Sequence, residues 1–365
     1  MNTRRAVLSA EPVGAAEYAQ IEQAFARLLD TRRDFLLLQG EAILALEAAT
    51  RGLGGPGFRV LNVVTGPYGS ALGAWFRQSG ALVEELAVPF DRAVSAEAVA
   101  TALARGGHDL VSVVHAEAAT GAVNPLAEVA ARAHAAGALV FVDAVASLGA
   151  EPLDIDGCEL DLVVVSAQKA LAGPTGVSAV VVGPRAWERL EANPAAPRQS
   201  ILSLLDWREG WLLPGRRVLP LIPHHVETRL LAEALELGAS EGLARVVARH
   251  AAARSASRRG LRALGLAPWV ESERAAASVA TMLRVPDGLD PALLLEATQS
   301  CGLGAILGPA PATLSDRCLR INHTGARAAP EPVVSALVAL GSGLRRLGRQ
   351  ADLGGAVTAA LADER

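Results

Sequence analysis

The fold is indicated most clearly by two apolar stretches, LVFVDAVAS at residues 139–147 and DLVVVSAQK at residues 161–169. Each holds a run of branched apolar residues, and each run is followed by one ionisable residue, Asp143 in the first stretch and Lys169 in the second. Continuous runs of this kind are typical of parallel strands that are covered by helices on both faces. Because the carboxyl ends of such strands face the ligand crevice, we predict that Asp143 and Lys169 project into one pocket.

Apolar and helical segments alternate on both sides of these stretches. We expect strands at residues 60–64, 82–86, 110–115, 139–142, 162–166 and 179–182, and helices at 41–51, 70–78, 95–104 and 125–135. Ser95 and Asn124-Pro125 are typical helix starts, and Gly137 is a typical helix end. The alternation predicts an α/β fold, in which a mainly parallel sheet lies between helices.

The C-terminal part has a different pattern. Residues 228–264 indicate one long helix or two, and they are followed by expected strands at 278–285 and 318–321 and helices at 290–299 and 331–346. We therefore predict a large domain of residues 1–242 and a smaller α+β domain of residues 243–365. Between them, residues 186–229 are rich in proline and tryptophan, and we expect them to wind over the surface or across a subunit boundary.

Composition excludes several classes of protein. The 365 residues are 51% hydrophobic and 20% charged, which excludes a disordered chain and a small disulfide scaffold. The net charge of -4 is spread evenly, so neither nucleic acid nor a membrane is expected as a partner. No apolar stretch approaches the roughly 20 residues of a membrane span, and no export signal is present. The three cysteines lack metal-ligand spacing, so we expect no metal and a cytoplasmic location.

A lysine and a carboxylate at neighbouring strand ends are what pyridoxal chemistry requires. The amine of Lys169 would form a Schiff base with the aldehyde, and Asp143 would keep the pyridine nitrogen protonated, so that the ring acts as an electron sink. The same lysine would then shuttle the α-proton of the substrate. The strand pattern alone equally fits a structural ion pair at the edge of the sheet.

Five motifs in order identify a family. They are TGPYG at residues 65–69, His115 with Asn124-Pro125, VDAV at 142–145, SAQKAL at 166–171 and RINHTG at 320–325. Over residues 35–346 the chain resembles the class V aminotransferases of fold type I, with Asn322 and Thr324 as departures in the last motif. The resemblance implies a large pyridoxal-binding domain, a small C-terminal domain and a homodimer or larger homo-oligomer.

The resemblance also assigns roles to residues. It implies that Lys169 is the Schiff-base lysine, that Asp143 pairs with the pyridinium nitrogen, that Tyr68 stacks on the ring and that Arg320 binds the substrate carboxylate. The last two roles agree with physical chemistry, because an aromatic ring can lie against a flat heterocycle and a guanidinium can grip a carboxylate through two parallel hydrogen bonds. Their ordinary alternatives are a core aromatic residue and a surface arginine.

Other residues near these motifs are less clearly defined. Thr120 is expected to line the hydroxyl side of the ring, and Gln168 is expected at the cofactor beside the lysine, where it orients its neighbour. The roles of His115 and Glu117 stay open, because a histidine at a strand end is often only structural.

The chain departs from the family at the expected phosphate site. Where other members begin their first large-domain helix with a small, hydroxyl-rich loop, this chain has LQGEAIL at residues 38–44. A carboxylate at a helix N-terminus is favourable by roughly 0.3–1 kcal/mol, whereas a carboxylate beside a phosphate is repelled. We therefore predict that Glu41, with Ala42 beside it, lies at the cofactor and replaces the phosphate. Ile222 also stands where the family has a phosphate-binding threonine. The alternative is that Glu41 is an ordinary first-turn acid that points into solvent.

Residues 40–49 and 192–207 resemble the family members that use unphosphorylated pyridoxamine as a substrate. We therefore expect transfer of an amino group between free pyridoxamine and a 2-oxo acid such as pyruvate. Two departures concern the substrate: PAPA at residues 309–312 stands where a second arginine is expected, and the N-terminal arm is short.

Two alternatives to this function are a conventional aminotransferase with bound pyridoxal 5'-phosphate, of the alanine- or serine-glyoxylate type, and a non-catalytic relative that only binds vitamin B6. A cysteine desulfurase is disfavoured, because Cys301 and Cys318 lie in helix-like or strand-like surroundings rather than on a mobile loop.

Overall fold

A seven-stranded sheet forms the centre of the larger lobe in the computed structural model, which describes residues 11–362. The strand order is β1-β9-β8-β7-β4-β2-β3. The four pairings from β3 to β8 are parallel, while β9 runs antiparallel to both β8 and β1. The bounds are β1 Asp34–Gln39, β2 Arg59–Val64, β3 Leu82–Ala87, β4 Leu110–Val114, β7 Leu139–Asp143, β8 Leu162–Val165 and β9 Val177–Val182.

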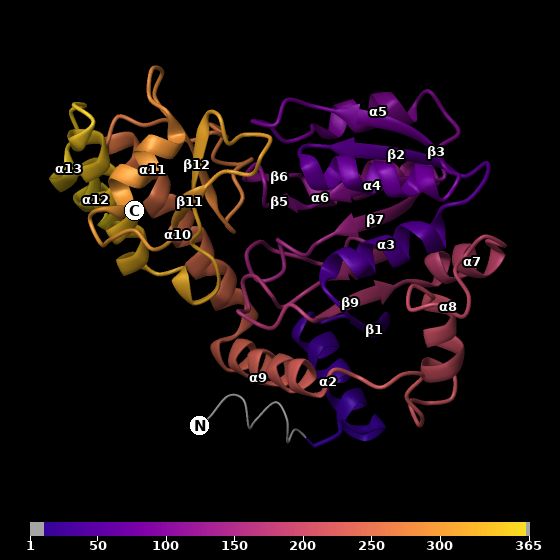
Figure 1. Cartoon of the computed structure of the whole chain (residues 1–365). Coiled ribbons are helices and arrows are strands. Elements are labelled where there is room, and N and C mark those ends of the chain that lie inside the picture. Colours follow the sequence, from indigo (N-terminus) through magenta and orange to yellow (C-terminus); the bar gives the residue numbers. More distant parts are fainter. Residues whose placement is uncertain (1–10, 363–365) are drawn as a thin grey trace.

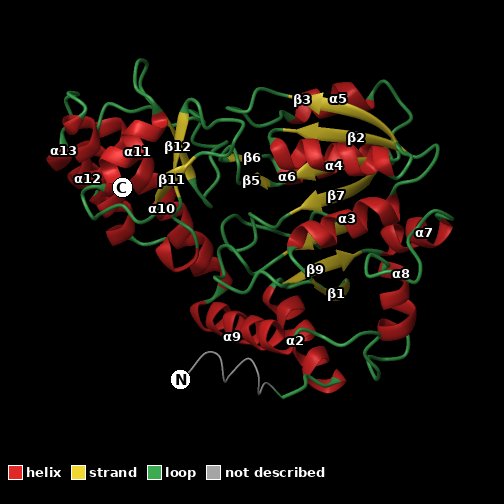
Figure 2. Ribbon diagram, viewed as in Figure 1, coloured by secondary structure: helices red, strands yellow, loops and turns green. Residues whose placement is uncertain are grey.

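The predicted α/β fold is confirmed, and its central strands are the apolar runs that indicated it. Every residue of β4, β7, β8 and β9 is buried, because helices cover both faces of the sheet (Figure 2). One strand, β1, was not among those expected. Its sequence DFLLLQ has neither β-branched residues nor alternation, so its pattern does not separate a strand from a buried helix.

Helices follow the strands close to the expected positions. They are α3 Ala42–Leu53, α4 Pro67–Gln78, α5 Ala96–Leu103 and α6 Leu126–Ala135. The chain reverses its direction across the sheet after β3, so right-handed crossovers place α4 on one face and α5 and α6 on the other. A two-stranded hairpin, β5 Ala116–Glu117 with β6 Ala122–Val123, follows β4. Between residues 11 and 362, no helix combines the length and the apolar character needed to cross a membrane.

The segment of residues 186–229 is partly buried, so the prediction that it winds over the surface was incomplete. It contains most of α7 Pro184–Ala192, all of α8 Leu204–Trp207 and a π-helix at Arg208–Leu212. Trp207 and Trp211 pack against Tyr18 of α2 Ala15–Leu28, a helix that was not predicted. The indole of Trp211 donates a hydrogen bond of 3.0 Å to the buried Glu22. The segment therefore closes the core of the larger lobe.

The C-terminal elements gather in a second lobe beside the sheet (Figure 1). Its antiparallel sheet has the order β10-β12-β11 and is packed by four helices. The elements are α10 Leu243–Ala263, β10 Thr281–Arg284, α11 Pro291–Gln299, β11 Leu307–Pro309, β12 Cys318–Ile321, α12 Pro330–Arg346 and α13 Leu353–Leu361.

The two largest hydrophobic clusters lie one in each lobe, and two small clusters contain residues of both lobes, so the predicted division at residues 242/243 stays a prediction. Of the one long helix or two that were expected, the structure has two, α9 His225–Glu241 and α10, which meet at Gly242, whose φ of 85° favours glycine. Val246 in the first turn of α10 still packs in the core of the larger lobe. The helix α10 therefore joins the two lobes, and we propose that the small domain begins within it.

A core leucine tests whether the small lobe has its own cooperative core. Leu337 of α12 is fully buried and fits against Gly260 of α10, so Leu337→Ala is expected to cost about 2–5 kcal/mol. The control Leu293→Ala removes a side chain that is 56% exposed, and should cost under about 0.5 kcal/mol. Urea unfolding followed by circular dichroism measures both losses. Equal losses would contradict the separate core.

Candidate active site

The predicted site residues converge on a small cavity of about 50 Å³ at the carboxyl ends of β4 and β7. Six of the eight predicted residues line it: Glu41, Ala42, Tyr68, Asp143, Gln168 and Lys169. The other two, Thr120 and Arg320, lie outside its lining.

Lys169 stands in the turn after β8, and its Nζ lies 5.6 Å from the centre of the Tyr68 ring. Burial lowers the pKa of this amine below its usual range, while the carboxylates of Asp143, Glu117 and Glu41 act in the opposite direction. A larger fraction of the amine is therefore neutral, and so nucleophilic, than in a lysine in water.

Asp143 is the last residue of β7 and is only 5% exposed. Its Oδ1 accepts a hydrogen bond of 2.9 Å from the backbone N–H of Val145. Burial raises the pKa of this carboxyl, and the nearby Lys169 opposes the rise. A second cation inside the cavity would stabilise the ionised form further.

Tyr68 belongs to the first turn of α4, and Glu117 holds that turn in place. The Glu117 carboxylate accepts hydrogen bonds from the backbone N–H groups of Tyr68 and Gly69, at 3.2 and 3.3 Å. A Cβ atom on Gly66 would come within 2.2 Å of the Glu117 side chain, so the turn requires glycine there. Burial raises the pKa of Glu117 to about 7. Sequence reasoning left Glu117 open; its place in an otherwise apolar hairpin was the available clue.

Thr120 supports the loop that precedes Tyr68 through a hydrogen bond. Its hydroxyl donates a hydrogen bond of 3.3 Å to the carbonyl of Thr65, and Asn124 donates one of 2.9 Å to the Thr65 hydroxyl. The side chain of Thr120 is fully buried. Its predicted place beside the pyridine ring stays a prediction.

Glu41 is the N-cap of α3, and its carboxylate folds back over the start of that helix. Oε2 accepts a hydrogen bond of 2.8 Å from the N–H of Ile43, and Oε1 accepts one of 2.7 Å from Nε2 of Gln168. The side chain is exposed, but both oxygens have partners in the cavity wall. The carboxylate is thus hydrogen-bonded on the protein, and the predicted place of Glu41 at the cofactor stays a prediction.

Arg320 lies in β12 of the small lobe, opposite Met282 and Gly308 of the neighbouring strands. Its Nε is buried without a hydrogen-bond partner, and burial lowers the pKa of the guanidinium. A buried donor without a partner is costly, so this group is suited to a carboxylate ligand.

The RINHTG motif reaches the lysine turn from the other lobe. Gly325 has a φ of 61°, and a Cβ there would lie 3.1 Å from the carbonyl oxygen of Lys169. Its N–H donates a hydrogen bond of 3.1 Å to Nε2 of His250, and His323 is bonded to Thr281 at 2.7 Å. These contacts fix the strand of Arg320 against the turn of Lys169.

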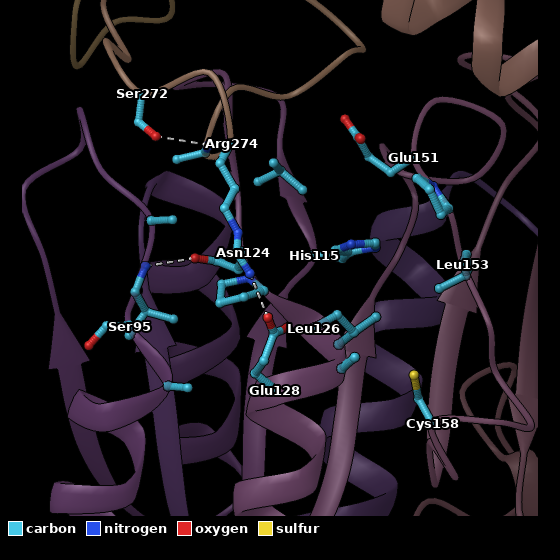
Figure 3. A pocket seen from close by; sticks show the side chains of 18 of the residues that line it. Ser95, His115, Asn124, Leu126, Glu128, Glu151, Leu153, Cys158, Ser272 and Arg274 are labelled. Carbon is cyan, nitrogen blue, oxygen red and sulfur yellow. Dashed lines mark hydrogen bonds and ion pairs between the residues drawn. The ribbon is translucent and has the colours of Figure 1, made fainter.

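A larger cavity, of about 780 Å³, opens near the starts of α5 and α6 (Figure 3). His115 and Glu151 line it, but no lysine does. Burial lowers the pKa of His115 to about 4, which keeps the ring neutral at physiological pH. We assign the active site to the smaller cavity, because it holds the nucleophilic amine. Within residues 11–362, no group of three or more histidine, cysteine or acidic side chains is placed to hold a metal ion.

Comparisons with known proteins identify the family of the chain. The model of the family "Aminotransferase class-V" matches residues 2–327. Pyridoxamine–pyruvate transaminase of Mesorhizobium japonicum is 36% identical over 328 residues, which cover 90% of this chain and 83% of the relative. A 2-aminoethylphosphonate–pyruvate transaminase of Burkholderia thailandensis is 32% identical, with 85% of this chain and 83% of the relative covered.

A solved structure agrees as well. The crystal structure of pyridoxamine-pyruvate aminotransferase from Mesorhizobium loti superposes with a TM-score of 0.91 at 32% identity, and covers 99% of this chain and 93% of its own. The ordered motifs, the cavity around the lysine and these matches lead to one conclusion. The chain belongs to the class-V aminotransferases and shares their fold-type I architecture and their transaminase chemistry.

Proposed function

We propose that this transaminase transfers an amino group between free pyridoxamine and a 2-oxo acid such as pyruvate. One observation carries the proposal: the Glu41 carboxylate lies over the start of α3, bonded to Ile43 and Gln168. A helix start is a natural site for a phosphate group, and here a protein carboxylate already uses its N–H donor. The relatives that are named as pyridoxamine–pyruvate transaminases support the same substrates.

The size of the repulsion supports exclusion of phosphate. Two unit charges about 4 Å apart interact by about 1 kcal/mol in water and by about 4 kcal/mol near a protein surface. A phosphate monoester carries roughly 1.5–2 negative charges at neutral pH. Since every 1.4 kcal/mol is about tenfold in affinity, even an exposed carboxylate disfavours the phosphorylated vitamin by about an order of magnitude.

The residues around the cavity fit the pyridine ring of the vitamin. Asp143 is a buried carboxylate suited to the ring nitrogen, Tyr68 offers an aromatic face, and Lys169 offers an amine with a lowered pKa for the aldehyde. The bound ring supplies the electron sink for the transfer. Lys169 Nζ would hold and return the α-proton of the substrate, while Arg320 would orient the substrate carboxylate.

The substrate carboxylate would be held by fewer arginines than the resemblance suggests. β11 ends at Pro309, and residues 309–312 are Pro, Ala, Pro and Ala, so no second guanidinium comes from that strand. Recognition of the 2-oxo acid would therefore depend on Arg320 and on residues outside the RINHTG motif.

A second candidate is a conventional transaminase that retains pyridoxal 5'-phosphate. The observation in its favour is that Gln168 and the start of α3 offer N–H donors that would suit a phosphate if Glu41 turned away. The third reading, a relative that only binds the vitamin, is disfavoured because Lys169, Asp143 and Arg320 are all present.

We also propose a homodimer or larger homo-oligomer in the cytoplasm. Large apolar side chains are exposed on one surface segment: Leu213 at 69%, Val218 at 70% and Ile222 at 81%. Exposed apolar groups this close together are typical of a surface that another protein covers. All three cysteines are free, which fits a reducing compartment.

Substitutions at Glu41 test the exclusion of phosphate. Wild-type protein should bind pyridoxal more tightly than its phosphate. Glu41→Ser keeps a good N-cap, removes both charge and volume, and should raise the relative affinity for the phosphate at least tenfold. Glu41→Gln removes only the charge and should give a smaller rise. Titration of the absorbance spectrum gives each dissociation constant. Tighter binding of the phosphate by the wild-type protein would defeat the proposal.

The pH dependence of pyridoxal binding tests the electrostatic role of Asp143. The Asp143 carboxylate raises the pKa of Lys169, so Asp143→Asn should lower it further. Since the neutral amine reacts, the midpoint of the spectral change with pH should move to a lower pH. Glu97→Gln, which replaces a carboxylate that does not act on Lys169, is the control. An unchanged or higher midpoint in Asp143→Asn would contradict this arrangement.

Turnover separates an enzyme from a binding protein. Steady-state assays with pyridoxamine and a series of 2-oxo acids should show product formation that is lost in Lys169→Ala. If wild-type and variant proteins bind pyridoxamine but neither turns over, the chain is a binding relative.

A further inference from the structure

Glu41 needs a second partner if it is to keep a phosphate out. Its side chain is exposed, and its bond to Ile43 engages only Oε2 and lies within its own helix. With that bond alone, rotation of the side chain would open the start of α3. The bond from Gln168 to Oε1 is the contact that ties the carboxylate to the opposite wall of the cavity.

The chemistry of the two groups fixes which way the Gln168 amide faces. An ionised carboxylate only accepts hydrogen bonds, so the NH₂ end of the amide must point to Glu41. The other end, Oε1, is buried without a partner. Leaving this acceptor without a partner is destabilising. The opposite orientation of the amide would nevertheless place Oε1 against the Glu41 carboxylate, where two acceptors would face each other. The backbone N–H of Gln168 is bonded to Ser166 at 3.4 Å, which restrains the residue at the end of β8.

We propose that Gln168 is a positioning residue that holds the Glu41 carboxylate across the start of α3, and so sets how strongly the site rejects the phosphorylated vitamin. The inference rests on the proposed function. It also gives Gln168 a second role, which favours binding of phosphate and does not oppose it. Without the Glu41 carboxylate, the NH₂ group of Gln168 faces the emptied helix start and becomes a donor for phosphate.

If this arrangement is correct, Gln168→Leu should change the relative affinity for pyridoxal phosphate in opposite directions in proteins with and without Glu41. In the presence of Glu41, Gln168→Leu frees the carboxylate to turn out, so pyridoxal phosphate should gain affinity relative to pyridoxal. In the Glu41→Ser background, Gln168→Leu removes a phosphate donor, so pyridoxal phosphate should lose relative affinity. Each change should be about three- to tenfold, the range for one hydrogen bond.

The experiment measures the dissociation constants of pyridoxal and pyridoxal phosphate by absorbance titration of four full-length proteins: wild type, Gln168→Leu, Glu41→Ser and the double variant. Gln168→Asn keeps the amide but shortens the side chain by one methylene, so it is the matched control for polarity. It should reproduce the sign seen with leucine in each background. Circular dichroism and thermal unfolding check that every variant is folded.

The outcomes separate this inference from the proposed function. If Glu41→Ser raises the relative affinity for the phosphate, but Gln168→Leu acts in the same direction in both backgrounds, Gln168 does not position Glu41 and only this inference falls. If Glu41→Ser leaves the ratio unchanged, Glu41 excludes nothing and both fall. Opposite signs in the two backgrounds support both.

Discussion

The site depends on keeping one amine reactive among several acids. Burial lowers the pKa of Lys169, while the carboxylates of Asp143, Glu117 and Glu41 raise it. Without the carboxylates the amine would lose its charge more readily still, and without burial it would stay a cation at neutral pH. Since the carboxyl groups of Asp143, Glu117 and Glu41 all act on one lysine, one more anion in the cavity would add to the negative charge around it. On the proposed function, a preference for the unphosphorylated vitamin would thus depend on the whole charge arrangement and not on Glu41 alone.

The same balance explains why both lobes contribute. The acids and the lysine come from the larger lobe, and Arg320 comes from the small lobe. Gly325 contacts the turn of Lys169, and the N–H of Ala277 is bonded to the carbonyl of Gly121 in the hairpin that carries Glu117, at 2.8 Å. A shift of the small lobe would therefore act on both the lysine turn and the Tyr68 loop.

Much of this was predictable from the sequence, because the decisive features are local. The valine-rich strands that end at Asp143 and shortly before Lys169 can be recognised from their composition. The N-cap at Glu41 is indicated by an acid that precedes an apolar helix. Strand β1 was missed, because a leucine run has no strand period. Long-range pairs were out of reach: no pattern connects Gln168 to Glu41 or Glu117 to the N–H of Tyr68, since these partners meet only when the sheet forms.

A coenzyme has to stay bound between turnovers, whereas a substrate has to leave. A phosphate anchors a vitamin through several charge-assisted hydrogen bonds that persist through every chemical step. On the proposed function, Glu41 takes the Ile43 and Gln168 donors for the protein itself, so the ring is held only by groups that contact its face, its nitrogen and its aldehyde. When pyridoxamine donates its amino group, the vitamin becomes the aldehyde pyridoxal, and water would have to free the Lys169 amine before pyridoxal could leave. On the proposed function, the absence of a phosphate anchor would then let the vitamin exchange with solvent, so Glu41 would also make repeated turnover with free pyridoxamine possible.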